Sequence, residues 1–227
     1  MKRSEKKLII ISNESGPFAD REEAGRLLSR ELKAYKGNNT VVLGIPRGGM
    51  IVAGSIAREL GCGLDIIISR KLRAPGNPEL AIGAVTENGK VFLNGGFAGA
   101  SGADKGYISG EVAYQLGEIQ RRISLFRAVK PKIGLKGKTV IVTDDGLATG
   151  LTMQAALWSA RQENPEMIIA ALPVAPQDSL EMIAETADRT VCLRVPRFFY
   201  GVGQFYRDFS QTDDEEVLEI LRRGKPG

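Results

Sequence analysis

The sequence predicts a doubly wound α/β fold with a mainly parallel sheet flanked by helices. Short apolar, β-branched runs alternate with amphipathic helical patterns along the chain. The length of 227 residues suits one domain with a large core. Several apolar runs end in loops of small or charged residues, which is where open α/β sheets bind ligands. We therefore expect a single domain over residues 1–227.

The first elements follow from local signals. Residues 8–12 form either a short strand or an apolar lead-in. Asp20, with Glu23 three residues later, is typical of a helix start. The apolar run 40–45 predicts a buried strand, followed by a helix over about 50–60. Between them lies Pro46-Arg47-Gly48-Gly49, which is either a tight turn with a solvated arginine or a loop that binds an anion.

The middle of the chain predicts a strand and a hairpin. The run 64–69 predicts a strand that ends in the basic cluster Arg70-Lys71-Leu72-Arg73. This cluster is either a solvated face or part of a ligand site at the sheet edge. Residues 74–78 should form a loop. Asn88-Gly89 between residues 80–86 and 90–93 favours a β-hairpin with a type I′ turn.

A glycine-rich segment, residues 95–106, follows the hairpin. We expect it to hold no fixed shape without a ligand, as either a disordered linker or a lid that closes on substrate and excludes water. A lid would span about residues 87–110, and Lys105 or Tyr107 could then reach the site. The spacing of apolar residues predicts a long helix over 109–127.

The strongest pattern lies at residues 139–153, where an apolar strand is followed by Asp144-Asp145, a small-residue loop and a helix. The acids could accept hydrogen bonds from neighbouring sugar hydroxyls. Backbone N–H groups of the loop and the helix N-terminus suit a phosphate. The alternative is that Asp145-Gly146 is only a turn and Thr149 only a helix cap.

The C-terminal part continues the alternation, with strands at 167–174 and 189–195 around a helix at 178–186. The aromatic segment 196–206 is either a hydrophobic cover or subunit interface, or a surface that stacks on a flat acceptor. Residues 212–215 cap a last helix that runs through Leu221.

Composition excludes several classes of function. The chain has no histidine, which excludes a Ser-His-Asp hydrolase and a histidine-ligated metal. The two cysteines form neither a zinc pattern nor a disulfide framework, which favours a reduced, cytoplasmic setting. The net charge of +4 and the lack of a long basic run do not point to nucleic acid. The run Leu8 to Ile11 is too short for a signal peptide or a membrane span.

Two nucleotide-binding motifs can also be excluded. Gly137-Lys138-Thr139 is no P-loop, because position 132 is a lysine and the segment precedes a strand. Gly61-Cys62-Gly63 lacks the third glycine of a dinucleotide fingerprint and also precedes a strand.

Residues 140–152, with two acids followed by Thr149-Gly150-Leu151-Thr152, resemble the motif of type I phosphoribosyltransferases that binds 5-phosphoribosyl-1-pyrophosphate (PRPP). The resemblance implies that family's fold, with a mobile hairpin or lid and a small C-terminal hood over about residues 196–227. It also implies Mg²⁺ as the cofactor.

The resemblance assigns candidate roles to residues of this chain. Asp144 and Asp145 would hold the ribose hydroxyls and contact Mg²⁺ indirectly. The 5′-phosphate would bind at Ala148, Thr149, Gly150, Leu151 and Thr152. Pyrophosphate would bind at Arg47, Gly48, Lys71 and Arg73.

The implied activity is transfer of phosphoribose from PRPP to a nitrogenous acceptor, with a nucleobase expected, within nucleotide metabolism. Hypoxanthine–guanine enzymes carry an aspartate where this chain has Ala148, so the acceptor is left open. The alternatives are a non-catalytic PRPP or nucleotide sensor, and hydrolysis or phosphorolysis of a ribose phosphate. A homodimer is compatible with either activity.

Overall fold

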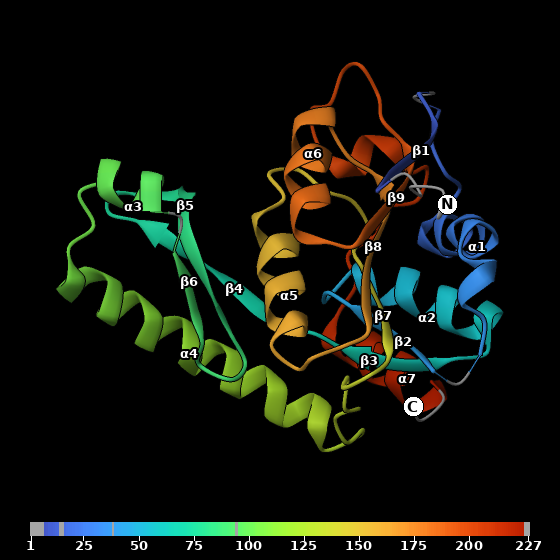
Figure 1. The fold of residues 1–227 in the computed structure, drawn as a ribbon, viewed down its shortest axis with the longest axis horizontal. Coiled ribbons are helices and arrows are strands. Elements are labelled where there is room, and N and C mark those ends of the chain that lie inside the picture. The colour runs from blue at the N-terminus through green and yellow to red at the C-terminus, as the bar shows by residue number, and fades with distance from the viewer. Residues whose placement is uncertain (1–6, 14–15, 38, 94, 225–227) are drawn as a thin grey trace, which may run out of the picture.

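The computed structural model describes residues 7–13, 16–37, 39–93 and 95–224. A parallel sheet of six strands forms its centre, in the order β1-β9-β8-β7-β2-β3 (Figure 1). These strands are β1 Leu8–Ser12, β2 Thr40–Gly44, β3 Gly63–Ile66, β7 Thr139–Thr143, β8 Met167–Val174 and β9 Arg189–Arg194. The doubly wound parallel fold predicted from the sequence is confirmed.

Helices cover both faces of the sheet because alternate strand residues point to opposite sides. In β2, Val42 packs in the core under the N-terminal helices, whereas Val41 and Leu43 pack in the core on the other side. One face carries α1 Arg21–Glu31, α2 Gly49–Leu60 and α7 Asp214–Arg223, and the other carries α5 Leu151–Arg161 and α6 Gln177–Thr186. A short 3₁₀ turn, Lys33–Tyr35, follows α1.

An arm, residues 69–127, projects from the sheet (Figure 1). Along the chain it follows β3 and precedes β7. It holds a second, three-stranded sheet in the order β4-β5-β6, which is antiparallel. The long helix α4 runs along it. The elements of the arm are β4 Ser69–Ala74, β5 Asn77–Thr86, β6 Val91–Leu93, α3 Gly95–Ala100 and α4 Lys105–Arg127.

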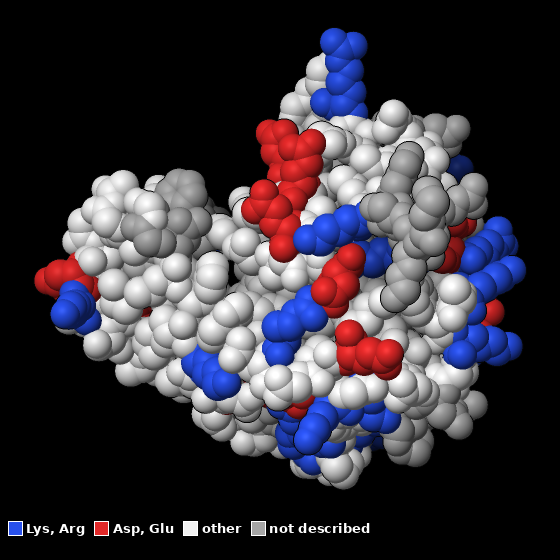
Figure 2. Space-filling model, in the orientation of Figure 1, with Lys and Arg blue, Asp and Glu red and all other residues white. Residues whose placement is uncertain are grey.

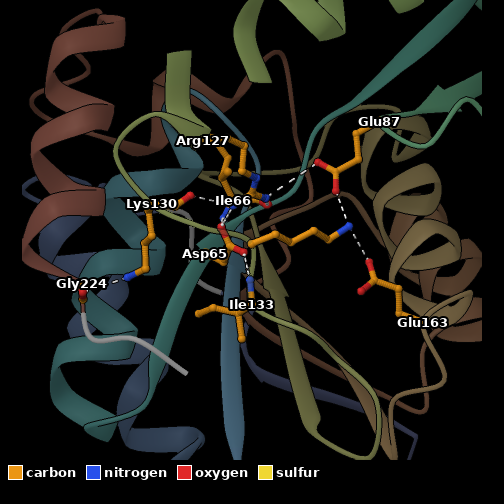
Figure 3. A network of polar contacts seen from close by, with 9 residues as sticks. Asp65, Ile66, Glu87, Arg127, Lys130, Ile133, Glu163 and Gly224 are labelled. Atoms are coloured by element: carbon orange, nitrogen blue, oxygen red, sulfur yellow. Dashed lines mark hydrogen bonds and ion pairs between the residues drawn. The ribbon is translucent and has the colours of Figure 1, made fainter. Parts of the chain in front are cut away.

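A network of buried charges fixes the base of the arm to the sheet (Figure 3). The Asp65 carboxylate on β3 accepts from Nη1 of Arg127 at 2.6 Å and from the backbone N–H of Ile133 at 2.8 Å. Lys132 pairs with Glu87 at the hairpin and, at 2.8 Å, with Glu163 beyond α5. Both the hairpin turn and the C-terminal end of α4 are therefore held against the core.

The arm departs from the sequence expectations in three places. The predicted strand 64–69 ends at Ile66, and the basic cluster expected at the end of that strand lies within a separate strand, β4. Residues 95–100, expected to lack a fixed shape, form α3. α4 begins at Lys105, four residues before the predicted start, because Asp104 caps it by accepting from the backbone N–H of Tyr107 at 2.7 Å. Whether this part of the arm closes over a ligand stays a prediction.

The hairpin, the remaining strands and the last helix agree with the sequence. Val85 pairs with Val91 on either side of the predicted turn. The uncertain segment 8–12 is a strand that pairs with β9. Asp213 caps α7 by accepting from the N–H of Glu216 at 2.9 Å.

Residues 196–213, here called the hood loop, return toward the N-terminal part of the chain. They contain the 3₁₀ turn Val202–Phe205. Phe18 and Tyr206 form a parallel bridge, and their ring centroids lie 5.4 Å apart. The rest of the expected hood is α7, which packs on α2. Within the described ranges, no helix combines the length and the apolar character needed to span a bilayer.

Candidate active site

The candidate site lies where β2 and β7 end, at the carboxyl edge of the sheet. Because β2 and β7 are parallel neighbours, the loops after both strands meet there. The loop after β7 supplies Asp144 and Asp145. Gly48, in the loop after β2, and Gly49, the first residue of α2, lie beside them.

Both glycines contact the acid pair so closely that no side chain fits. A Cβ on Gly48 would lie 2.8 Å from Cγ of Asp145 and closer still to Oδ2. A Cβ on Gly49 would lie 2.8 Å from both Cα and Oδ1 of Asp144. The glycine loop and the carboxylates thus form one continuous surface.

Arg21, at the start of α1, binds the second acid. Its Nε donates to Oδ2 of Asp145 at 2.8 Å, and the two side chains are only 8% and 17% exposed. The hydroxyl of Tyr206 donates to the backbone carbonyl of Asp145 at 2.5 Å. Neither residue was predicted from the sequence, and both lie far from Asp145 along the chain. No local pattern links them to it.

The electrostatics of the pair follow from burial. Burial raises the pKa of Asp144 well above its ordinary value, and the charge of Asp145 raises it further. Burial also raises the pKa of Asp145, although the hydrogen bond and charge of Arg21 oppose this. Among the described residues, Asp145 has a cationic partner within hydrogen-bond distance, Arg21, whereas Asp144 has none. The pair therefore favours a ligand that supplies hydroxyl donors or a cation.

The small-residue loop has the form expected of a phosphate site. Gly150 has φ of 79°, a conformation that favours glycine, and α5 begins at Leu151. Ala148 and Thr149 are exposed. The backbone carbonyl of Ala148 accepts from Oγ of Ser179 at 2.6 Å, which fixes the loop against α6. The N-terminus of α5 therefore remains open to an anion.

A cavity of about 440 Å³ separates the arm from the sheet next to these loops. It brings together three of the sequence-predicted residues, Lys71, Arg73 and Thr152. Its remaining lining is Ile45, Pro46, Ile68, Ser69, Arg70, Gln115 and Arg122. Arg47 is exposed just beyond Pro46.

Arg122, on α4, is a cavity residue that the sequence did not single out. Its Nε is buried and has no hydrogen-bond partner among the described residues. Burial lowers the pKa of Arg122, and the charge of Arg70 lowers it further. In the sequence Arg122 looks like any polar residue on a helix surface. Its position shows only when α4 is placed beside β4.

The other arginines of the cavity have defined partners. Nε and Nη2 of Arg73 donate to the Glu111 carboxylate at 2.7 and 3.0 Å. Nε of Arg70 donates to Oε1 of Gln115 at 2.8 Å. Gln115 in turn donates to Glu111 at 2.9 Å. α4 thus orients both arginines of β4.

The two candidate lid residues lie apart from the acid pair. The hydroxyl of Tyr107 donates to the backbone carbonyl of Arg73 at 3.1 Å, which joins α4 to β4. Lys105 is exposed at the first position of α4, at the end of the arm away from the sheet (Figure 1). Neither lines the cavity.

The residues present fit a magnesium ion that is shared with a substrate. Within residues 7–13, 16–37, 39–93 and 95–224, no group of three His, Cys, Asp or Glu side chains could hold a metal. Mg²⁺ instead commonly takes one or two carboxylates, substrate phosphates and water. Asp144 and Asp145 meet that requirement, since they supply two adjacent carboxylates, and among the described residues only Asp145 has a cation, Arg21, within hydrogen-bond distance.

Comparisons with known proteins give one consistent family. A scan against protein families matches residues 20–210 to the phosphoribosyl transferase domain. "Putative phosphoribosyl transferase Rv0571c" of Mycobacterium tuberculosis (strain H37Rv) is 41% identical over 206 residues, covering 91% of this chain and 46% of that protein. The values are the same for its counterpart MT0597 in strain CDC 1551. The chain thus spans about half the length of the curated relatives it matches.

One solved structure matches over nearly the whole chain. The crystal structure of TT1426 from Thermus thermophilus has a TM-score of 0.83 and 42% sequence identity. The match covers 93% of this chain and 100% of that chain. The arm and the sheet therefore belong to a fold with a closely similar solved relative.

Proposed function

Because the chain belongs to the phosphoribosyl transferase domain family, we propose that it transfers the 5-phosphoribosyl group from PRPP to a nitrogenous acceptor and releases pyrophosphate. The observation that carries the proposal is the partly buried pair Asp144 and Asp145, which lies against a glycine loop and beside two further surfaces, an open helix N-terminus and a cationic cavity. The acid pair, the helix N-terminus and the cavity suit the ribose hydroxyls, the 5′-phosphate and the pyrophosphate of PRPP, respectively.

Each surface has a role in the proposed reaction. Asp144 and Asp145 accept hydrogen bonds from the ribose hydroxyls. The loop Ala148–Thr152 and the N-terminus of α5 hold the 5′-phosphate. Arg47, the N–H groups at Gly48 and Gly49, and the cavity side chains bind pyrophosphate. To the predicted Lys71 and Arg73 we add Arg70 and Arg122.

Departure of pyrophosphate takes the electron pair of the C1–O bond and leaves positive charge on the ribose ring. The cations of the cavity stabilise the charge that develops on the leaving group. Asp144 and Asp145 would hold Mg²⁺ indirectly, and the ion would lower the cost of that charge. The nitrogen of the acceptor then bonds to C1 and loses a proton.

The acceptor and pyrophosphate have separate places at the sheet edge. Pyrophosphate lies on the side of β2 and β3, where the arm stands. The hood loop lies on the side of β8, since a Cβ on Gly146 would lie 2.5 Å from Val202 of the hood loop and 3.2 Å from Val174 of β8. A flat acceptor under the hood loop would attack C1 from the side opposite the leaving group. Ala148 leaves the identity of the acceptor open.

An acceptor screen that monitors pyrophosphate release from PRPP with Mg²⁺ tests the proposal. Release with one acceptor identifies the reaction and its substrate. Calorimetry with PRPP and Mg²⁺ tests the donor site separately. Absence of PRPP binding in the presence of metal would overturn the proposal.

A non-catalytic sensor is the second candidate, because the same fold can serve regulation. A sensor should bind PRPP but should release no pyrophosphate when an acceptor is added. A sensor that binds nucleic acid would need a clustered basic surface. Figure 2 shows basic and acidic side chains interspersed over the core on the face it displays. A cytoplasmic setting and a homodimer stay predictions.

A further inference from the structure

Arg21 joins two parts of the molecule that the proposed reaction uses separately. Its Nε donates to Asp145 at 2.8 Å, and its Nη1 donates to the backbone carbonyl of Ser210 in the hood loop at 2.9 Å. Its guanidinium carbon lies 4.0 Å from the centroid of the Phe209 ring. One buried side chain thus contacts both an acid of the ribose site and the loop on the acceptor side.

The hood loop is joined to the N-terminal segment by a short ribbon of backbone hydrogen bonds. The backbone N–H of Arg207 donates to the carbonyl of Phe18 at 2.8 Å, and the N–H of Asp208 donates to that of Ala19 at 3.0 Å. Tyr206 and Phe209 stack at 5.3 Å. Two side chains join this ribbon to Asp145: the Tyr206 hydroxyl donates to its backbone carbonyl, and Arg21 donates to its carboxylate.

We propose that Arg21 is a positioning residue that couples binding of the ribose of PRPP at Asp145 to ordering of the hood loop, and so to formation of the acceptor side of the site. The inference rests on the proposed function, because it requires PRPP to bind at the acid pair.

The coupling follows from the geometry of a guanidinium group. Its N–H groups are fixed in one plane, so an arginine that bonds Asp145 through Nε directs Nη1 toward a defined point. Ser210 accepts at that point. A ligand that fixes the Asp145 carboxylate therefore also fixes the place at which the hood loop is anchored. Conversely, an ordered hood loop holds Asp145 in the orientation that the ribose requires.

Arg26, on the same helix, provides the contrast. It pairs with Glu22 at 3.5 Å, and both side chains are about half exposed. Exposed pairs of this kind contribute little to stability or to binding. Replacement of Arg26 therefore controls for the loss of an arginine from α1.

The first test measures the affinity for PRPP with Mg²⁺ by calorimetry in Arg21→Gln, Arg21→Lys and Arg26→Gln. We expect Arg21→Gln to weaken binding at least about tenfold and Arg26→Gln less than about twofold. Arg21→Lys should lie between them, since lysine keeps the charge but has one nitrogen to serve both partners. Equal affinity of wild type and Arg21→Gln would overturn the inference while leaving the proposed function intact. If the wild type binds no PRPP, the proposed function itself fails.

The second test measures coupling, which a merely structural role for Arg21 would not produce. Hydrogen exchange is followed at the amides of Arg207 and Asp208 with and without PRPP and Mg²⁺. We expect PRPP to slow their exchange several-fold in the wild type and to leave it unchanged in Arg21→Gln at saturating PRPP. No change in the wild type, or the same slowing in both proteins, would overturn the coupling.

Phe209→Ala keeps the test valid if Arg21→Gln folds poorly. Phe209 is 40% exposed, so its loss should leave the fold intact. The inference predicts that Phe209→Ala weakens PRPP binding several-fold, because it removes the hood-loop ring that lies 4.0 Å from the Arg21 guanidinium carbon. Unchanged PRPP affinity in Phe209→Ala would contradict it.

Discussion

Gly48 lies directly against Asp145: a Cβ on Gly48 would stand 2.8 Å from Cγ of Asp145 and 2.8 Å from Nε of Arg21. The loop after β2 and the acid after β7 are therefore in van der Waals contact before any ligand binds. Changes in the glycine loop should act on the acid pair, and changes in the acid pair should act on the loop.

Gly48→Ala is expected to weaken binding of PRPP with Mg²⁺ by more than about tenfold, because the added methyl group must displace the Asp145 carboxylate. The backbone is not the obstacle, since Gly48 has φ of −57°. Gly134→Ala is the matched control, because its Cβ would meet no described atom within 4 Å. Calorimetry that finds equal affinities for the two variants would contradict the packing described here.

Asp144→Asn is expected to stabilise the ligand-free protein at neutral pH by at least about 1 kcal/mol while abolishing tight PRPP binding. Burial raises the folded-state pKa of Asp144 well above 3.8, so the folded state binds the proton more tightly than the unfolded state. Stability should therefore fall as pH rises from about 4 through that raised pKa, and the asparagine variant should lack this part of the fall.

Thermal unfolding of wild type and Asp144→Asn between about pH 4 and 8 measures this difference. The gap between the two proteins should widen with pH. A constant gap would show that Asp144 does not change its charge in this range.

Arg122→Gln is expected to weaken binding of pyrophosphate with Mg²⁺ by about tenfold, the effect of one charge-assisted hydrogen bond of about 1.4 kcal/mol. Arg121→Gln is the control, since Arg121 is its neighbour on α4 but is 65% exposed and pairs with Glu118. It should change the affinity less than about twofold. If both variants lose affinity for pyrophosphate equally, the loss comes from the net charge of α4, and a specific contact of Arg122 with pyrophosphate is contradicted.

Glu111→Gln is expected to lower the free energy of unfolding by about 1–2 kcal/mol, because Glu111 loses its bidentate pairing with Arg73. Burial tends to raise the pKa of Glu111, but hydrogen bonds from Arg73 and Gln115 outweigh it, so the pKa is lowered. Its contribution is thus present above the unfolded pKa of about 4.5 and is lost as pH falls below it. The control Glu118→Gln, on the outer surface of α4, should change denaturation midpoints little at any pH.

Asp65→Ala is expected to destabilise the protein by about 3 kcal/mol, because Arg127 and the N–H of Ile133 both lose a buried acceptor. Urea denaturation gives the value. Glu219→Ala removes one partner of an exposed pair with Arg223 and should cost less than about 0.5 kcal/mol. A similarly small cost for Asp65→Ala would show that the base of the arm is not fixed by this network.

The parts predicted from sequence are those set by local pattern. The strand, acids and loop at 139–153 give the motif and its place at the sheet edge. The alternation of strands and helices gives the parallel fold. The basic cluster was predicted at the end of the strand before it, although its alternation contained the signal of a strand of its own: Leu72 and Ala74 are buried while Lys71 and Arg73 are partly exposed.

The parts that could not be predicted depend on contacts between distant segments. Arg21 is 124 residues from Asp145, and Arg122 is not near any other cavity residue except Gln115 along the chain. Helix propensity and the spacing of apolar residues predict that Arg21 and Arg122 lie on helices. They do not predict which elements those helices pack against. From the sequence alone, an arginine at either position could equally lie on a solvated surface.

The bridge between Phe18 and Tyr206 has a consequence for the order of events during synthesis. Tyr206 follows Asp145 by 61 residues, and Ser210 emerges later still. A nascent chain can complete β2, β7 and the acid pair while the hood loop is still within the ribosome. Asp145 would then lack its contact with Tyr206 and would be better hydrated than in the finished protein. Docking of the hood loop at this site therefore includes dehydration of Asp145.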